Sequence, residues 1–316
     1  MSELRWHPFL REWVITATHR QERTFFPPDD YCPLCPTRSA EVPTEIPRDD
    51  YEIAVFENRF PSLCIPPPEP TIEPSNVADV RASAGICEVV CYSSSHTATL
   101  ADLSVDQVRR LVRVWKERYL RLSAIPGIEY VYIFENKGKE IGVTLSHPHG
   151  QIYAYPFVPR VIQNRLDAER EHSLSTGRRL IDDWIADEIA DGRRIVYETP
   201  RWICIVPLFA RYPYEVHVAP KFGASDMRAL DDAALDGLAD AVQTVARKYD
   251  RLFGFSMPYI MSVFQFHADY SGLVVEFTPP YRTADKLKYL AGSEAGCGVF
   301  INDTLPEETA EELRLL

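Results

Sequence analysis

The chain has 316 residues, 46% hydrophobic and 25% charged, the balance of a globular protein with one large domain or two ordinary ones. Its net charge of −12 argues against a nucleic-acid surface, which needs clustered Lys and Arg, but leaves room for a small anionic substrate in one pocket. No run approaches the roughly 18 apolar residues that cross a bilayer, and the N-terminus lacks the apolar core of a secretory signal. We therefore expect a cytoplasmic protein without membrane contact, whose seven cysteines are thiols or metal ligands rather than disulfides.

Short strands are predicted on both sides of irregular, proline-rich segments. Residues 51–63 and 201–216 each predict a strand followed by a turn. The prolines between Pro61 and Pro74 predict a loop, since proline lacks the N–H that regular structure needs.

Two long helical segments are also indicated. Ser104, followed three residues later by Gln107, matches a capping box that opens a helix. Apolar side chains at helical spacing predict a second helical segment from Val161 to Asp191, which Gly192 could end.

The two halves of the chain resemble each other at an offset of 127 residues. The matched positions include a strand, a helix start, a glycine and a second strand: Glu88 and Glu215, Ser104 and Asp231, Leu111 and Leu238, Gly127 and Gly254, Tyr132 and Tyr259. Chance similarity between two amphipathic helices is the alternative, but the match continues without gaps into the next strand. The repeat predicts an α+β fold of two tandem halves, 1–160 and 161–316, each an antiparallel sheet with a packed helix.

Polar chemistry is concentrated in the first half, in the sequence His147-Pro148-His149-Gly150-Gln151. Two-residue spacing in a strand would place His147, His149 and Gln151 on one face. A solvent-exposed sheet edge would explain such residues without function. Apolar neighbours on both sides favour burial instead, where polar side chains need partners.

A metal site is suggested by Cys32-Pro33-Leu34-Cys35. A single C-x-x-C can also be a redox pair or an accident of sequence. A structural zinc needs two further ligands, for which His96 and one histidine of the 147–149 pair are candidates.

These segments together resemble the galactose-1-phosphate uridylyltransferases, a branch of the histidine-triad superfamily. The resemblance rests on the run FENKGKEIGVTLSHPHGQIYA at 134–154, the early C-x-x-C, VVCYSSSHTATLADLS at 89–104, FENRFPSL at 56–63 and ITATHRQER at 15–23. It extends from about residue 11 to about residue 305, in order throughout, and is looser in the second half.

The resemblance implies a double-displacement transfer of UMP between UDP-glucose and a hexose 1-phosphate, by default galactose 1-phosphate, in a homodimer. It implies a zinc ion on Cys32, Cys35, His96 and His147, with His149 as the nucleophile. Imidazole suits this role because it attacks near neutral pH and its phosphoramidate can pass the group on. Contacts with nucleotide, phosphate or sugar phosphate fall to the remaining predicted site residues: Gln151, Asn58, Asn136, Thr144, Arg20, Arg23 and Lys288.

The second half departs from the family pattern. Many relatives carry a second metal on a Glu and three His, but Gly272 and Val274 stand where two histidines are expected and Arg165 replaces the Glu. We therefore expect no second metal and a purely structural His267. We also expect His217, which alternates with valines, to face solvent.

The sugar and the base stay open. Phe300 stands where the galactose enzymes have a Gln that touches the hexose. A sibling nucleotidyltransferase, such as an ADP-glucose phosphorylase or an enzyme for a specialised sugar phosphate, is the main alternative. A nucleotide hydrolase is disfavoured by Gln151, where an ionisable histidine would suit hydrolysis better, and an inactive nucleotide-binding scaffold is disfavoured by the intact His-Pro-His-Gly-Gln.

Overall fold

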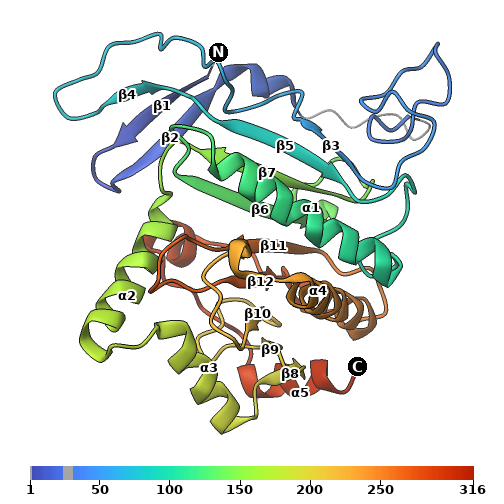
Figure 1. Cartoon of the computed structure of the whole chain (residues 1–316), viewed down its shortest axis with the longest axis vertical. Helices are drawn as coiled ribbons and strands as arrows, with labels where there is room; N and C mark the ends of the chain where they lie inside the picture. Colours follow the sequence, from blue (N-terminus) through green and yellow to red (C-terminus); the bar gives the residue numbers. More distant parts are fainter. Residues whose placement is uncertain (1, 24–30) are drawn as a thin grey trace.

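One antiparallel sheet runs through the whole molecule (Figure 1), a computed structural model that describes residues 2–23 and 31–316. Its nine strands lie in the order β3-β5-β7-β6-β11-β12-β10-β9-β8. In that order, their bounds are Ala54–Glu57, Ile86–Cys91, His149–Tyr155, Tyr130–Lys137, Tyr259–Phe264, Val274–Thr278, Val216–Pro220, Trp202–Ile205 and Ile195–Glu198. Two small sheets flank it: β2-β1-β4 (Glu12–Ala17, Ser2–His7, Val80–Ala82) and β13-β14 (Tyr281–Thr283, Lys286–Leu287).

The strand order confirms the predicted α+β fold with internal duplication. Outward from the centre, the first half runs β6, β7, β5, β3 and the second half runs β11, β12, β10, β9. The two halves join where β6 pairs with β11, with Ile133 opposite Val263 and Asn136 opposite Ile260. The repeated units therefore form one continuous sheet rather than two separate ones.

Helices α1 (Val105–Ser123) and α4 (Asp232–Leu252) cover one face of this sheet. They are amphipathic, as the repeat predicted, and bury Leu111 and Leu238 in a single core with β-strand residues from both halves. Both predicted N-caps are present: Ser104 Oγ accepts from the N–H of Gln107 at 3.2 Å, and Asp231 accepts from Ala234 at 2.7 Å. The capping box is only half formed, because the Gln107 amide donates to the carbonyls of Glu52 and Tyr92 instead.

The predicted helix over 161–191 is two helices, α2 (Arg160–Thr176) and α3 (Leu180–Asp191). The break falls at Gly177, whose φ of 72° ends α2, and Gly192 ends α3 in the same left-handed conformation, as expected. Both helices pack on the sheet face opposite α1 and α4, but only over its centre and second half, where Ile181 meets Ile203 and Leu166 meets Tyr130. The same face of the first half carries the small β2-β1-β4 sheet, through Leu4 of β1, and loops.

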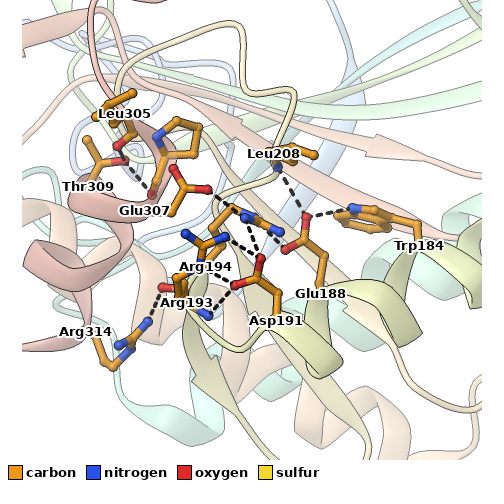
Figure 2. A network of polar contacts seen from close by, with 11 residues as sticks. Trp184, Glu188, Asp191, Arg193, Arg194, Leu208, Leu305, Glu307, Thr309 and Arg314 are labelled. Atoms are coloured by element: carbon orange, nitrogen blue, oxygen red, sulfur yellow. Dashed lines mark hydrogen bonds and ion pairs between the residues drawn. The ribbon is translucent and has the colours of Figure 1, made fainter.

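Helix α5 (Pro306–Arg314) is held to the body of the protein by a buried ionic network (Figure 2). Arg194 is only 5% exposed and pairs with Glu188 at 2.8 Å, Asp191 at 3.1 Å and Glu307 at 2.6 Å. Because each of these charges would be costly to bury alone, the network ties α3 and α5 together at the base of β8.

Short helical turns complete the chain: η1 (Thr18–Arg23), η2 (Lys139–Ile141), η3 (Met227–Ala229) and η4 (Gly292–Gly296). The stretch from Pro61 to Pro74 follows an irregular course, as its prolines predicted. No helix in the described ranges is long and apolar enough to cross a membrane.

Candidate active site

A cavity of about 410 Å³ opens on the loop-bearing face of the first half. Strand β7 contributes His149 and Gln151 to it, and β6 contributes Asn136. The remaining walls come from β3, β5, the C-x-x-C loop and its continuation, the turn after β3 and the loop that precedes β7: Phe56, Val89, Tyr31, Pro33, Leu34, Glu45, Asn58, Arg59, Phe60, Gly142, Val143, Thr144 and Leu145. The mixture of apolar walls and a few converging polar groups is typical of a small-molecule site.

The strand that carries the histidines begins later than the sequence pattern suggested. Pro148 has no N–H to give the ladder, and β7 starts at His149. His149 and Gln151 both line the cavity, as their spacing predicted. His147 lies outside the strand and turns toward the cysteines, so the expectation of three residues on one face was wrong for His147.

The ring of His149 is held in one tautomer. Its Nδ1 lies 2.8 Å from the carbonyl oxygen of His147, which can only accept, so Nδ1 carries the proton and Nε2 has a free lone pair. Burial lowers the pKa of His149, and the bond to the carbonyl opposes this shift only partly. A neutral imidazole with an unprotonated Nε2 is the form that can attack an electrophile.

Gln151 and Asn58 meet in the cavity wall. The side-chain N–H of Asn58 donates to Gln151 Oε1 at 3.4 Å, and the Tyr153 hydroxyl donates to the same oxygen at 3.1 Å. Asn58 is itself fixed, because its Oδ1 accepts from the N–H of Phe60 at 2.9 Å. The structure therefore brings together His149, Gln151, Asn58, Asn136 and Thr144 from the predicted site.

The four predicted metal ligands also converge. Donor atoms of Cys32, Cys35, His96 and His147 all lie within 4.8 Å of one another. Cys35 Sγ is 3.4 Å from His96 Nδ1 and 3.5 Å from His147 Nδ1, close to the spacing of ligands around a tetrahedral ion. The group could hold a metal ion, and the choice left open by the sequence falls on His147 rather than His149.

Tyr51, which the sequence did not single out, connects this cluster to the cavity wall. His147 Nε2 lies 2.7 Å from the Tyr51 hydroxyl and 2.8 Å from the carbonyl oxygen of Ser93. The hydroxyl in turn donates to the carbonyl of Leu34 at 2.9 Å. With its Nε2–H held on this side, His147 presents Nδ1 to the cysteines, the arrangement by which outer hydrogen bonds orient metal-binding histidines.

Two predicted contact residues, Arg20 and Lys288, lie outside the cavity lining, and the side chain of a third, Arg23, is outside the described residues. Arg20 is in η1, beside the Tyr153 hydroxyl, whose pKa is raised by burial and by the Cys87 thiol but lowered by Arg20. Arg23 ends η1, and its side chain falls outside the described residues. Lys288 is buried in the C-terminal segment, where it bonds Glu294 at 3.2 Å and the carbonyl of Ile301.

The second half carries an ionic cluster at the counterpart of this site. Glu276 on β12 lies opposite Ser262 of β11, as Gln151 on β7 lies opposite Phe134 of β6. Donor atoms of Glu215, His217 and Glu276 lie within 4.8 Å of one another. Glu276 also pairs with Arg165 at 2.5 Å and with Arg211 at 3.4 Å. Burial alone would raise the pKa of Glu276, but the charges of His217 and the two arginines outweigh burial and lower the pKa to about 2.

The structure tests the expected surroundings of two histidines in this half, His217 and His267. His217 does not face solvent: it is 5% exposed and lies 2.8 Å from Glu215, because both faces of β10 are covered. His267 is largely exposed and lies 3.1 Å from Asp226, a partner that suits the expected structural role. The expectation of a single metal stays a prediction.

Sequence reasoning missed Tyr51 and Tyr153, and only one of them had a local signal. Tyr153 is two residues from Gln151 in a predicted strand, so its position on the same face was readable. Tyr51 reaches His147 across 96 positions of sequence, and no spacing rule predicts such a contact.

Comparison with known proteins now places the chain. The N-terminal and C-terminal domain models of galactose-1-phosphate uridyl transferase match residues 1–159 and 163–314. A galactose-1-phosphate uridylyltransferase of Thermotoga maritima is 38% identical over 320 residues, covering 99% of this chain and 98% of the relative. One from Streptomyces lividans is 35% identical over 326 residues, covering 99% and 86%.

Solved structures agree. A uridylyltransferase structure superposes with a TM-score of 0.88 at 31% identity, covering 99% of this chain and 97% of its own. An ADP-glucose phosphorylase from Arabidopsis thaliana, with a TM-score of 0.76 at 23% identity, covers 100% and 99% and shares the fold.

The molecule is thus a transferase of the nucleotidyltransferase class. The chain belongs to the galactose-1-phosphate uridylyltransferase family.

Proposed function

We propose that the protein transfers UMP between UDP-glucose and a hexose 1-phosphate, galactose 1-phosphate by default, with His149 as the temporary carrier. The observation that carries the proposal is the His149 ring itself. Its Nδ1–H is engaged by the His147 carbonyl at 2.8 Å, and the ring lines a cavity large enough for a nucleotide. That nitrogen nucleophile sits in a family whose relatives are named for this transfer.

In the first step, His149 Nε2 attacks the phosphorus of UDP-glucose that bears the uridine. An N–P bond forms, the P–O bond to the glucose phosphate breaks, and glucose 1-phosphate departs with the bonding electrons. The positive charge that develops on the imidazole is stabilised by the Nδ1–H···O=C bond to His147. No general base is needed, because the attacking nitrogen is already unprotonated.

In the second step, a phosphate oxygen of the incoming hexose 1-phosphate attacks the same phosphorus. The N–P bond breaks, its electrons return to Nε2, and UDP-hexose leaves. Gln151 and Thr144 line the cavity beside His149 and would bond the phosphoryl oxygens without changing charge. Asn136 would contact the nucleotide, Asn58 the nucleoside, and Arg20, Arg23 and Lys288 the phosphates or sugar phosphate.

We further propose that the ion held by Cys32, Cys35, His96 and His147 is zinc. Two thiolates and two imidazoles fill a tetrahedral zinc shell and leave no open position, so the ion would supply structural cross-linking rather than chemistry. What these residues do is fix the C-x-x-C loop, with the cavity residue Leu34, against the start of β7.

The working form proposed is a cytoplasmic homodimer with two halves per chain, residues 1–160 and 161–316, and no second metal. Seven free cysteines suit a reducing compartment. Apolar side chains are exposed on the loop after β9 and on the C-terminal segment: Leu208, Phe209, Tyr289, Leu290, Val299 and Ile301. The two segments contact each other, since Asn302 donates to the carbonyl of Ala210 at 3.0 Å. Such a surface is typical of a subunit interface, and a partner there could bring Lys288 near a neighbouring cavity.

Exchange assays with paired nucleotide sugars and sugar phosphates test this function. We expect UDP-glucose with galactose 1-phosphate to give UDP-galactose and glucose 1-phosphate, and His149→Ala to abolish the exchange. Faster phosphorolysis of ADP-glucose than exchange of UDP-glucose would favour the sibling activity. Release of free UMP without an acceptor would indicate a hydrolase.

A further inference from the structure

The side-chain amide of Gln151 can present either its oxygen or its N–H₂ group to the cavity, because the two ends differ little in shape. Only the N–H₂ end attracts a phosphoryl oxygen, and the oxygen end would repel it. Something in the protein must therefore select the orientation before the nucleotide arrives.

The contacts around Gln151 make that selection. Its Oε1 accepts from the Tyr153 hydroxyl at 3.1 Å and from Asn58 Nδ2 at 3.4 Å. If the amide turned over, its N–H₂ group would face two donors and two hydrogen bonds would be lost. Since Gln151 is 8% exposed and Tyr153 9% exposed, water could not easily replace them.

Both donors are themselves held in their roles. Asn58 cannot turn over, because its Oδ1 accepts from the N–H of Phe60 at 2.9 Å. The Tyr153 hydroxyl donates to Gln151 Oε1, and its other neighbours, the Cys87 thiol and the Arg20 guanidinium, leave that role open to it, since the guanidinium can only donate to the tyrosine oxygen. The stronger of the two bonds to Oε1, by length, is the one from Tyr153.

We propose that Tyr153 is a positioning residue for the transfer: it fixes the Gln151 amide with its N–H₂ group toward the phosphoryl group on His149. This inference rests on the proposed function, because it assigns a partner to Gln151 in that reaction. Tyr153 itself does not contact the reacting atoms and acts only through Gln151.

The test is a set of four variants on the zinc-loaded, full-length protein: Tyr153→Phe, Gln151→Ala, the double variant, and Tyr155→Phe as a matched control. Tyr155 is two residues further along β7 and packs against Tyr153 and Phe157. Rapid quenching with labelled UDP-glucose gives the rate of protein labelling, its dependence on UDP-glucose concentration gives the affinity, and thermal melting reports stability.

We expect Tyr153→Phe to slow labelling about 10-fold, the effect of one lost orienting hydrogen bond, with nearly unchanged affinity for UDP-glucose. In the Gln151→Ala background the same change should alter the rate less than about twofold, because no amide remains to orient. Tyr155→Phe should label at the wild-type rate.

An equal loss in both backgrounds would overturn the proposal, since Tyr153 would then act independently of Gln151. An unchanged rate in Tyr153→Phe would overturn it as well. Both outcomes differ from a failure of the proposed function itself, in which the wild-type protein would take up no label at all.

Discussion

Gly150 lies between His149 and Gln151, and we predict that one added methyl group at this position destabilises the fold. A Cβ built there would lie 2.3 Å from the Tyr92 hydroxyl oxygen and 3.0 Å from the carbonyl oxygen of Phe134. Tyr92 cannot easily move, because it is fully buried and its hydroxyl donates to Glu135 at 3.2 Å. Overpacking of this kind costs about 1–3 kcal/mol, and we expect Gly150→Ala to lower the free energy of unfolding by about 3 kcal/mol.

A double-mutant cycle separates this clash from a general effect on β7. Tyr92→Phe removes the atom that clashes most and, with one hydrogen bond lost, should cost about 1 kcal/mol alone. Combined with Gly150→Ala, it should relieve the clash, so the double variant should be more stable than the sum of the single effects by about 1 kcal/mol or more. Urea denaturation at constant zinc measures all four proteins. Additive effects would refute the reasoning.

Three further predictions concern other parts of the molecule. Tyr51→Phe should lower zinc affinity about 10- to 100-fold in competition with a chelating dye, since His147 loses an outer partner, whereas Tyr31→Phe should not. Arg194→Met should lower the free energy of unfolding in chemical denaturation by about 3 kcal/mol, because the buried carboxylate of Glu188 loses its counter-charge. A loss no larger than that of an exposed ion-pair variant would contradict this. Burial raises the pKa of Glu135 from 4.5 to about 7, so the native state holds a proton that the unfolded state releases. As the pH rises from 4.5 to about 7, the free energy of unfolding of the wild type should fall by about 3 kcal/mol relative to that of Glu135→Gln. Parallel pH dependences of the two proteins would exclude the raised pKa.

The architecture was readable because the same pattern occurs twice. Leu111 and Leu238 recur at matching helix positions and do bury in one core, and Ser104 and Asp231 do cap the two helices. The joining of both halves into one sheet through β6 and β11 was not readable, because strand pairing between repeats depends on contacts distant in sequence.

Local rules failed where burial or a single residue overrode them. The periodicity of 161–191 continues across Gly177, but its φ of 72° divides the helix. His217 alternates with valines as an exposed residue would, yet the second half packs α3 over it and supplies Glu215 as a partner. Among the predicted site residues, those of β7 and its neighbours converge on one cavity, whereas Lys288 lies in a segment whose place depends on the whole fold.

The most direct test of this account is the mass of the protein after brief exposure to UDP-glucose and quenching in alkali. We predict one added uridylyl group on His149, lost on treatment with acid or on addition of galactose 1-phosphate, and no such group on His149→Ala. Exchange that proceeds at the wild-type rate in His149→Ala, or an adduct on another residue, would contradict it.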